Sequence, residues 1–117
     1  MSAEIVPSVG AGLARFDWKH TPLLRSWPKG GSMDCMDLAC NLLLPWSNRI
    51  SGGGFRFDDV FYKLLPNLPG ESYPIHGNGL TSAWTVDEVE ADAVILSLAS
   101  DGPVSYTHLT LPTKRIV

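Results

Sequence analysis

The sequence predicts an all-β fold of the antiparallel β-sandwich type, and three features of the chain indicate it. Apolar residues almost nowhere recur with the spacing of an amphipathic helix. Nine prolines and eleven glycines divide the 117 residues into short pieces. Within these pieces apolar and polar residues alternate with a period of two, which is typical of half-buried strands. A chain of this length can enclose one small core, so we expect a single domain.

The first predicted strand carries Ala14, Phe16 and Trp18 in alternation with Arg15 and Asp17. Successive side chains of a strand point to opposite faces of the sheet. The three apolar side chains should therefore share the face that is turned toward the core, and the two charged ones should face solvent. On this basis we expect the indole of Trp18 to be part of the core.

The next predicted element is a hairpin. Phe55 and Phe57 alternate with small or polar residues, and the pair Asp58-Asp59 follows directly. Two such residues between strand-forming segments are typical of a tight turn. The apolar segment 60–62 then supplies the returning strand.

A second hairpin is predicted near the other end of the chain. It runs from the strand 84–86 through a polar turn near 90–92 into the strand 94–98. Trp84 is expected in the core, because tryptophan in a β-sandwich is mostly buried. The returning strand should turn three side chains toward the same face, namely Val94, Leu96 and Leu98.

Between the two hairpins lies a loop over residues 66–79, rich in proline and glycine, with His76 near its end. Structureless loops of such length are mostly functional or disordered. The apolar and aromatic residues in this one argue against disorder. We therefore expect an ordered loop with a functional role.

The segment 105–117 differs in character from the rest of the chain. It resembles a tail found on unrelated translations in which sequencing-adapter DNA has been read as coding sequence. We therefore expect the domain to cover residues 1–104 and the tail to be non-native. The alternative is a genuine further strand, because apolar and polar residues alternate there too.

Composition and charge narrow the class of partner. The net charge is −3, from 12 acidic and 9 basic residues scattered along the chain. This pattern offers no basic patch for nucleic acid and no basic amphipathic segment for a membrane surface. A neutral or weakly charged partner fits better. No apolar run approaches the ~20 residues of a membrane helix, and the N-terminus does not resemble a signal peptide, so we expect a cytoplasmic protein.

The two cysteines, Cys35 and Cys40, do not indicate a metal site. Their spacing matches no zinc motif, and no nearby histidine completes a ligand set. Both are expected to be buried free thiols, since free cysteine is among the most buried residue types. No motif in the chain implies a metal or an organic cofactor.

Short motifs then follow one another in a fixed order. They are P-x-S-N-R-I at 45–50, G-x-F-x-F at 53–57, N-x-P at 67–69 and I-H-G at 75–77. With the segments 11–18 and 84–86, this ordered set resembles the N-terminal portion of the aldose 1-epimerase (galactose mutarotase) family over residues 3–103. One departure is at 41–43, where the family commonly shows an aromatic residue and a proline. That departure leaves the preferred sugar open.

The resemblance implies both a fold and an activity. The fold would be a partial antiparallel β-sandwich, the N-terminal part of a galactose mutarotase-like β-supersandwich. The activity would interconvert the α and β anomers of a free aldohexose. In that reaction a base takes the proton of the anomeric hydroxyl and an acid protonates the ring oxygen, so the ring opens and can close on its other face.

The resemblance also implies the substrate-binding residues Asn48, Arg49 and His76. The rigid guanidinium of Arg49 can donate to several sugar hydroxyls, and Asn48 can both donate and accept. His76 would lie near the ring oxygen. Taken alone, Arg49 could be a surface residue in an ion pair and His76 a simple turn residue. We expect all three side chains to converge on one pocket.

The family's proton-donating histidine, sugar-binding aspartate and proton-accepting glutamate lie in later motifs, and none is matched here. We therefore expect a truncated and inactive part of an aldose 1-epimerase, with no catalytic residue of its own. The alternative is a non-catalytic, epimerase-like carbohydrate-binding β-domain. A small β-domain for protein interaction is a third, less specific possibility.

Overall fold

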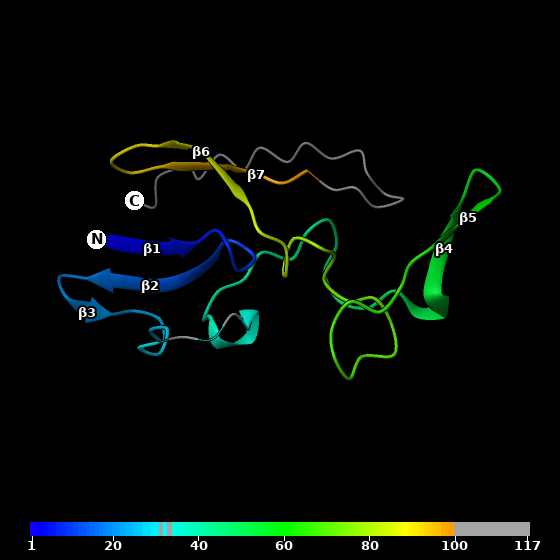
Figure 1. Ribbon diagram of the computed structural model, residues 1–117, viewed down its shortest axis with the longest axis horizontal. Helices are drawn as coiled ribbons and strands as arrows, with labels where there is room; N and C mark the ends of the chain where they lie inside the picture. Colours follow the sequence, from blue (N-terminus) through cyan, green and yellow to red (C-terminus); the bar gives the residue numbers. More distant parts are fainter. Residues whose placement is uncertain (31, 33, 100–117) are drawn as a thin grey trace.

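The computed structural model describes residues 1–30, 32 and 34–99, and Figure 1 shows how they are arranged. The predicted tail at 105–117 and the boundary at 104 lie outside these residues. The described strands are β1 (Ser2–Val6), β2 (Gly12–Trp18), β3 (Thr21–Pro22), β4 (Gly54–Phe57), β5 (Val60–Lys63), β6 (Thr85–Val89) and β7 (Val94–Ser97). Two single turns of 3-10 helix are also described, η1 (Cys35–Asp37) and η2 (Ser51–Gly53).

The strands form three antiparallel sheets, in the orders β1-β2-β3, β4-β5 and β6-β7. The predicted all-β, antiparallel fold class is therefore confirmed. In Figure 1 the β6-β7 hairpin lies beside β1, whereas β4 and β5 stand apart at the other end of the molecule. Long irregular segments between η1 and β6 connect these two parts.

Strand β2 contains a β-bulge that changes which side chains face the core. Glu4 of β1 pairs with Arg15, but the next residue, Ile5, pairs with Leu13, so the register skips Ala14. One extra residue in a strand shifts the alternation of its side chains by one position. The simple alternation predicted for this strand therefore does not continue along its whole length.

The bulge explains why the predicted position of Trp18 is wrong. Ala14 is buried as predicted, but Asp17 is 7% exposed and Trp18 is 48% exposed. The buried carboxylate is paired, because Arg15 Nη2 donates to Asp17 Oδ2 over 2.8 Å. Trp18 instead lies at the end of the sheet, where the Lys19 ammonium is 5.4 Å from the centre of its ring.

The hairpin β6-β7 forms as predicted with the predicted core face, although β6 begins at Thr85, just after Trp84, and continues to Val89. Trp84 and Leu96 are each 5% exposed and pack with Ala11 in one cluster. Val94 and Leu98 contact the same cluster, and so does Ile5 of β1. This cluster joins β6-β7 to the N-terminal sheet. A second cluster includes Ala14 of β2 and consists of Val9, Ala14, Cys35, Leu38 and Leu80.

The two cysteines differ in their surroundings. Cys35 is buried as predicted, and burial raises the pKa of its thiol. Cys40 is exposed, so its predicted burial is wrong. The backbone makes the contact at this position, because the carbonyl of Cys40 accepts a hydrogen bond of 2.9 Å from the amide of Leu13. Its side chain is therefore left at the surface.

The hairpin β4-β5 is formed as predicted, with a two-residue turn. Asp58 and Asp59 both have positive φ, 46° and 60°, as a type I′ turn requires. Phe55 stacks on its cross-strand partner Tyr62 with ring centroids 5.4 Å apart. The next pair on this face is far more exposed, with Phe57 at 62% and Val60 at 53%. We call residues 54–63 the ribbon.

We expect the 117-residue chain to self-associate through this ribbon, because a two-stranded sheet with exposed apolar residues leaves both edges open to pairing. Replacing Phe57 and Val60 with threonine keeps strand propensity and should lower the apparent mass measured by light scattering after size exclusion. Lys63→Gln, in the same ribbon, serves as the control. A monomeric chain with a sharply cooperative thermal transition would contradict the expectation.

Candidate functional site

Two segments that lie far apart in the sequence pair along their backbones. The amide of Ile50 donates to the carbonyl of Pro74 over 3.0 Å, and the amide of His76 donates to the carbonyl of Asn48 over 3.0 Å. Between these bonds Arg49 and Ile75 form an antiparallel bridge. The P-x-S-N-R-I and I-H-G motifs, separated by the ribbon and the long loop, are therefore adjacent in the fold.

The imidazole of His76 is held by the backbone of the other motif. The amide of Asn48 donates to His76 Nδ1 over 2.9 Å. A neutral imidazole has one donor and one acceptor nitrogen. Because Nδ1 accepts here, the neutral ring carries its proton on Nε2. His76 is half-buried, and Nε2 has no hydrogen-bond partner among the described residues, so this donor is available to a ligand.

The Asn48 side chain turns partly toward its own backbone. Its Oδ1 accepts a hydrogen bond of 2.8 Å from the amide of Arg49. Asn48 has a φ of 66° and His76 a φ of 62°, in the left-handed region where asparagine and histidine occur more often than most residues. The carboxamide oxygen of Asn48 is thus engaged, and its NH2 group is the part left to donate.

Arg49 makes a two-point ion pair with Glu71. Nε donates to Oε2 over 2.6 Å, and Nη2 donates to Oε1 over 2.5 Å. The ion pair that was the alternative role for Arg49 is therefore present in the structure. The pair occupies one edge of the guanidinium, and Nη1 has no partner among the described residues. About half of the Arg49 side chain, 48%, remains exposed, so a ligand could reach that free edge.

The pair shifts the pKa values of both side chains. The hydrogen bonds from Arg49 lower the pKa of Glu71 most; partial burial opposes this, and the charges of Arg49 and His76 lower it further. The same bonds raise the pKa of Arg49. Arg49 is bridged to Ile75, the residue before His76, and holds Glu71 in the ion pair. We call Arg49, Glu71 and His76, which the paired segments bring to the same region of the fold, the polar cluster.

The lowered pKa of Glu71 predicts how this cluster responds to acid. A carboxyl whose folded pKa lies below its ordinary value of 4.5 stabilises the fold above that value and loses this contribution as the pH falls through its folded pKa. We expect the Arg49 Nε–H resonance to be constant down to about pH 4.5 and to change below it. In Glu71→Gln this change should be absent; a change that persists would show that another group causes it.

Sequence reasoning missed two residues of this region, Glu71 and Asn67. The carboxamide of Asn67 accepts from the amide of Ile75 over 2.8 Å and donates to the carbonyls of Ile75 and Gly77 over 2.7 Å each. Asn67 is the first residue of the N-x-P motif, so the motif marked its position but not its role. Glu71 had only its place in the long loop as a signal.

Glycine at position 77 allows the loop to reach the segment before the P-x-S-N-R-I motif. Gly77 has a φ of 68°, and a Cβ there would lie 1.9 Å from the carbonyl oxygen of Leu44. That oxygen accepts a hydrogen bond of 3.0 Å from the amide of Gly79. Trp84 Nε1 donates to the carbonyl of Gly79 over 3.0 Å. The loop that carries His76 is thus fixed to the core at Gly79, just after the histidine.

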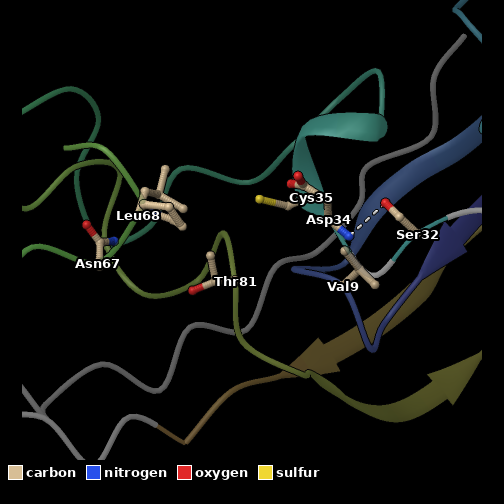
Figure 2. Close-up of a pocket in the computed structure, with 8 residues that line it drawn as sticks. Val9, Ser32, Asp34, Cys35, Asn67, Leu68 and Thr81 are labelled. Carbon is tan, nitrogen blue, oxygen red and sulfur yellow. Dashed lines mark hydrogen bonds between the residues drawn. The ribbon is translucent and has the colours of Figure 1, made fainter.

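An open cavity of about 490 Å³ is lined in part by the beginning of this loop, through Asn67, Leu68 and Pro69. Figure 2 shows it between Asn67, Leu68 and Thr81 on one side and Asp34 and Cys35 on the other. None of the three predicted site residues lines it. Within the described part of the chain, no group of three or more His, Cys, Asp or Glu side chains is placed to hold a metal ion. Nor is any helix there long and apolar enough to cross a membrane.

A family model and two curated proteins are similar to this chain in sequence. The family model described as aldose 1-epimerase matches residues 1–109. Two uncharacterized Escherichia coli K12 proteins are similar: YphB is 34% identical over 81% of this chain and 32% of its own length, and YihR is 32% identical over 96% of this chain and 35% of its own. The chain therefore spans about a third of the length of these curated relatives.

A solved structure shows the same relationship in three dimensions. A crystal structure of an E. coli K12 protein, provisionally assigned as an aldose 1-epimerase, superposes with a TM-score of 0.80 at 26% identity. The match covers 94% of this chain and 36% of that protein. The predicted resemblance and the type of β-fold are thereby confirmed. The chain belongs to the aldose 1-epimerase family.

Proposed function

We propose that this chain forms one side of the sugar-binding site of an aldose 1-epimerase that interconverts the α and β anomers of a free aldohexose. The observation that carries the proposal is the polar cluster in which the Nε2–H of His76 and the free edge of the Arg49 guanidinium are both available as donors. A neutral polyol needs such fixed donors, because it offers no charge by which it could be attracted.

Each side chain would have its own part in binding. The Nε2–H of His76 would donate to the ring oxygen, where negative charge develops as the ring opens. The guanidinium of Arg49 would donate to ring hydroxyls, with its orientation set by Glu71. The NH2 group of Asn48 would add a further donor. These contacts would hold the anomeric carbon in place for an acid and a base supplied from elsewhere.

Glu71 does not serve as that base in our proposal. Its carboxylate is occupied by Arg49, and the pair lowers its pKa. A carboxylate with a low pKa is a weak proton acceptor near neutral pH. With its only carboxylate engaged in this way, the cluster would bind sugar without performing the proton transfers. The same observation supports the second candidate, a non-catalytic carbohydrate-binding β-domain.

A mutarotation assay separates these possibilities. The longest open reading frame that contains this chain should be expressed, and the optical rotation of fresh α-glucose or α-galactose followed with and without the protein. We expect faster equilibration than in buffer alone. Sugar binding seen by NMR without acceleration would favour the non-catalytic candidate. Neither binding nor acceleration with any aldohexose tested would contradict both.

A further inference from the structure

The side chain of Asn67 forms hydrogen bonds with the backbone on both sides of His76. Its Oδ1 takes the amide hydrogen of Ile75, and its Nδ2 donates to the carbonyls of Ile75 and Gly77, with distances of 2.7–2.8 Å. The three bonds are partly buried, where hydrogen bonds to the backbone are less exposed to competition from water. One carboxamide therefore fixes the residue before His76 and the residue after it.

These hydrogen bonds affect the orientation of the His76 imidazole. His76 has a φ of 62°, a conformation that costs free energy and persists only where surrounding contacts impose it. In that conformation its ring reaches the amide of Asn48, which donates to Nδ1 over 2.9 Å. If the backbone at 75–77 relaxed, the ring would lose this donor, and either nitrogen could then carry the proton.

We propose that Asn67 is a positioning residue that keeps the proton of His76 on Nε2. The carboxamide sets the backbone at 75–77, the backbone aims the ring, and the Asn48 amide then fixes the tautomer. In the sugar-binding site proposed above, this would keep a donor, rather than an acceptor, facing the ring oxygen. Only this last step rests on the proposed function; the control of the tautomer does not.

Asparagine suits this position because of its mixed hydrogen-bonding capacity. The backbone presents one N–H and two carbonyls to residue 67, and a carboxamide matches them with one acceptor and one NH2 group. Aspartate has nearly the same shape, but its second oxygen would face the carbonyls of Ile75 and Gly77 without a hydrogen to share. Asn67→Asp therefore removes the two hydrogen bonds that Nδ2 donates, with little change in side-chain volume.

The test uses the longest open reading frame that contains this chain, with histidine labelled with 15N. In the wild-type protein the His76 ring should show the nitrogen shifts of the Nε2–H tautomer alone. In Asn67→Asp we expect a mixture of tautomers. Asn41→Ser is the control, since Asn41 Oδ1 has no hydrogen-bond partner among the described residues and serine introduces no buried charge; it should leave the His76 signals unchanged. If Asn67→Asp does not fold, Asn67→Ser is measured instead.

Kinetics supply a second readout. If the protein is a mutarotase, Asn67→Asp should lower kcat/KM by about 10- to 100-fold, the range seen when the residue that orients a metal-ligating histidine is removed. In a His76→Ala background the same change should have little further effect. A single Nε2–H tautomer that persists in folded Asn67→Asp, or an equal loss of kcat/KM in both backgrounds, would overturn the proposal. Absence of activity in the wild type would instead contradict the proposed function, and the NMR result would still decide the role of Asn67.

Discussion

Gly77→Ala is expected to destabilise the protein by about 3 kcal/mol, the combined effect of a left-handed backbone and an overpacked contact. The new Cβ would lie 1.9 Å from the carbonyl oxygen of Leu44 and 2.3 Å from its carbon. Both are backbone atoms, so no side-chain rotation can relieve the clash. The loop that carries His76 would have to move away from the segment before Asn48. Chemical denaturation of the protein encoded by the longest open reading frame measures the decrease in its free energy of unfolding.

Gly70→Ala is a matched control for this prediction. Gly70 has a φ of 80° in the same loop, but a Cβ there would meet nothing within 4 Å. The control therefore carries the cost of a left-handed alanine, roughly 1 kcal/mol, without the clash. Equal losses in the two variants would show that the contact between Gly77 and Leu44 does not constrain the loop.

If the protein is a mutarotase, as we propose, Arg49→Ala is expected to lower kcat/KM by about 100-fold, the lower end of the effect of removing a fixed donor from a site where charge develops in the reaction. The substitution removes the free edge that we assign to sugar hydroxyls, and it also leaves the Glu71 carboxylate without its cation. Arg49→Lys should recover little, because an ammonium cannot keep two contacts with Glu71 and also present a fixed edge to a ligand. Initial rates from optical rotation measure both variants.

Two further variants separate this effect from a loss of fold. Arg56 is an exposed arginine of the ribbon whose only described bond is a long one, 3.5 Å, to the carbonyl of Asp59, so Arg56→Ala should leave kcat/KM unchanged. Glu71→Gln keeps the arginine but loosens it, and we expect a smaller decrease than in Arg49→Ala. Wild-type kinetics in Arg49→Ala would remove the guanidinium from the site.

Local chemistry explains which parts of the fold the sequence could predict. The turn residues Asp58 and Asp59 and the alternation on either side of them determine the ribbon with little help from the rest of the chain. The same holds for β6-β7. Trp18 could not be placed in this way, because the bulge that turns it outward arises from the register of β2 on β1. Cys40 depends likewise on how its backbone meets Leu13.

The site was only partly predictable for a similar reason. The motifs indicated Asn48, Arg49 and His76, and the backbone pairing of their segments brings those residues together; their binding of sugar remains a proposal. Glu71 and Asn67 escaped notice because their partners lie on chain segments that fold back on them. No spacing in the sequence encodes a carboxamide that bridges two carbonyls, or a carboxylate that orients an arginine across a loop.

The ribbon has a consequence for how this part of the molecule could vary in length. Its base is closed where the amide of Leu64 donates to the carbonyl of Gly53 over 2.9 Å, and the pairing of Arg49 with Ile75 lies below that closure. The ribbon, residues 54–63, is thus an insertion whose two ends are already joined by a backbone hydrogen bond. Lengthening or trimming such an insertion changes the closure entropy only slowly, so it can gain or lose residues while the arginine and the histidine keep their places.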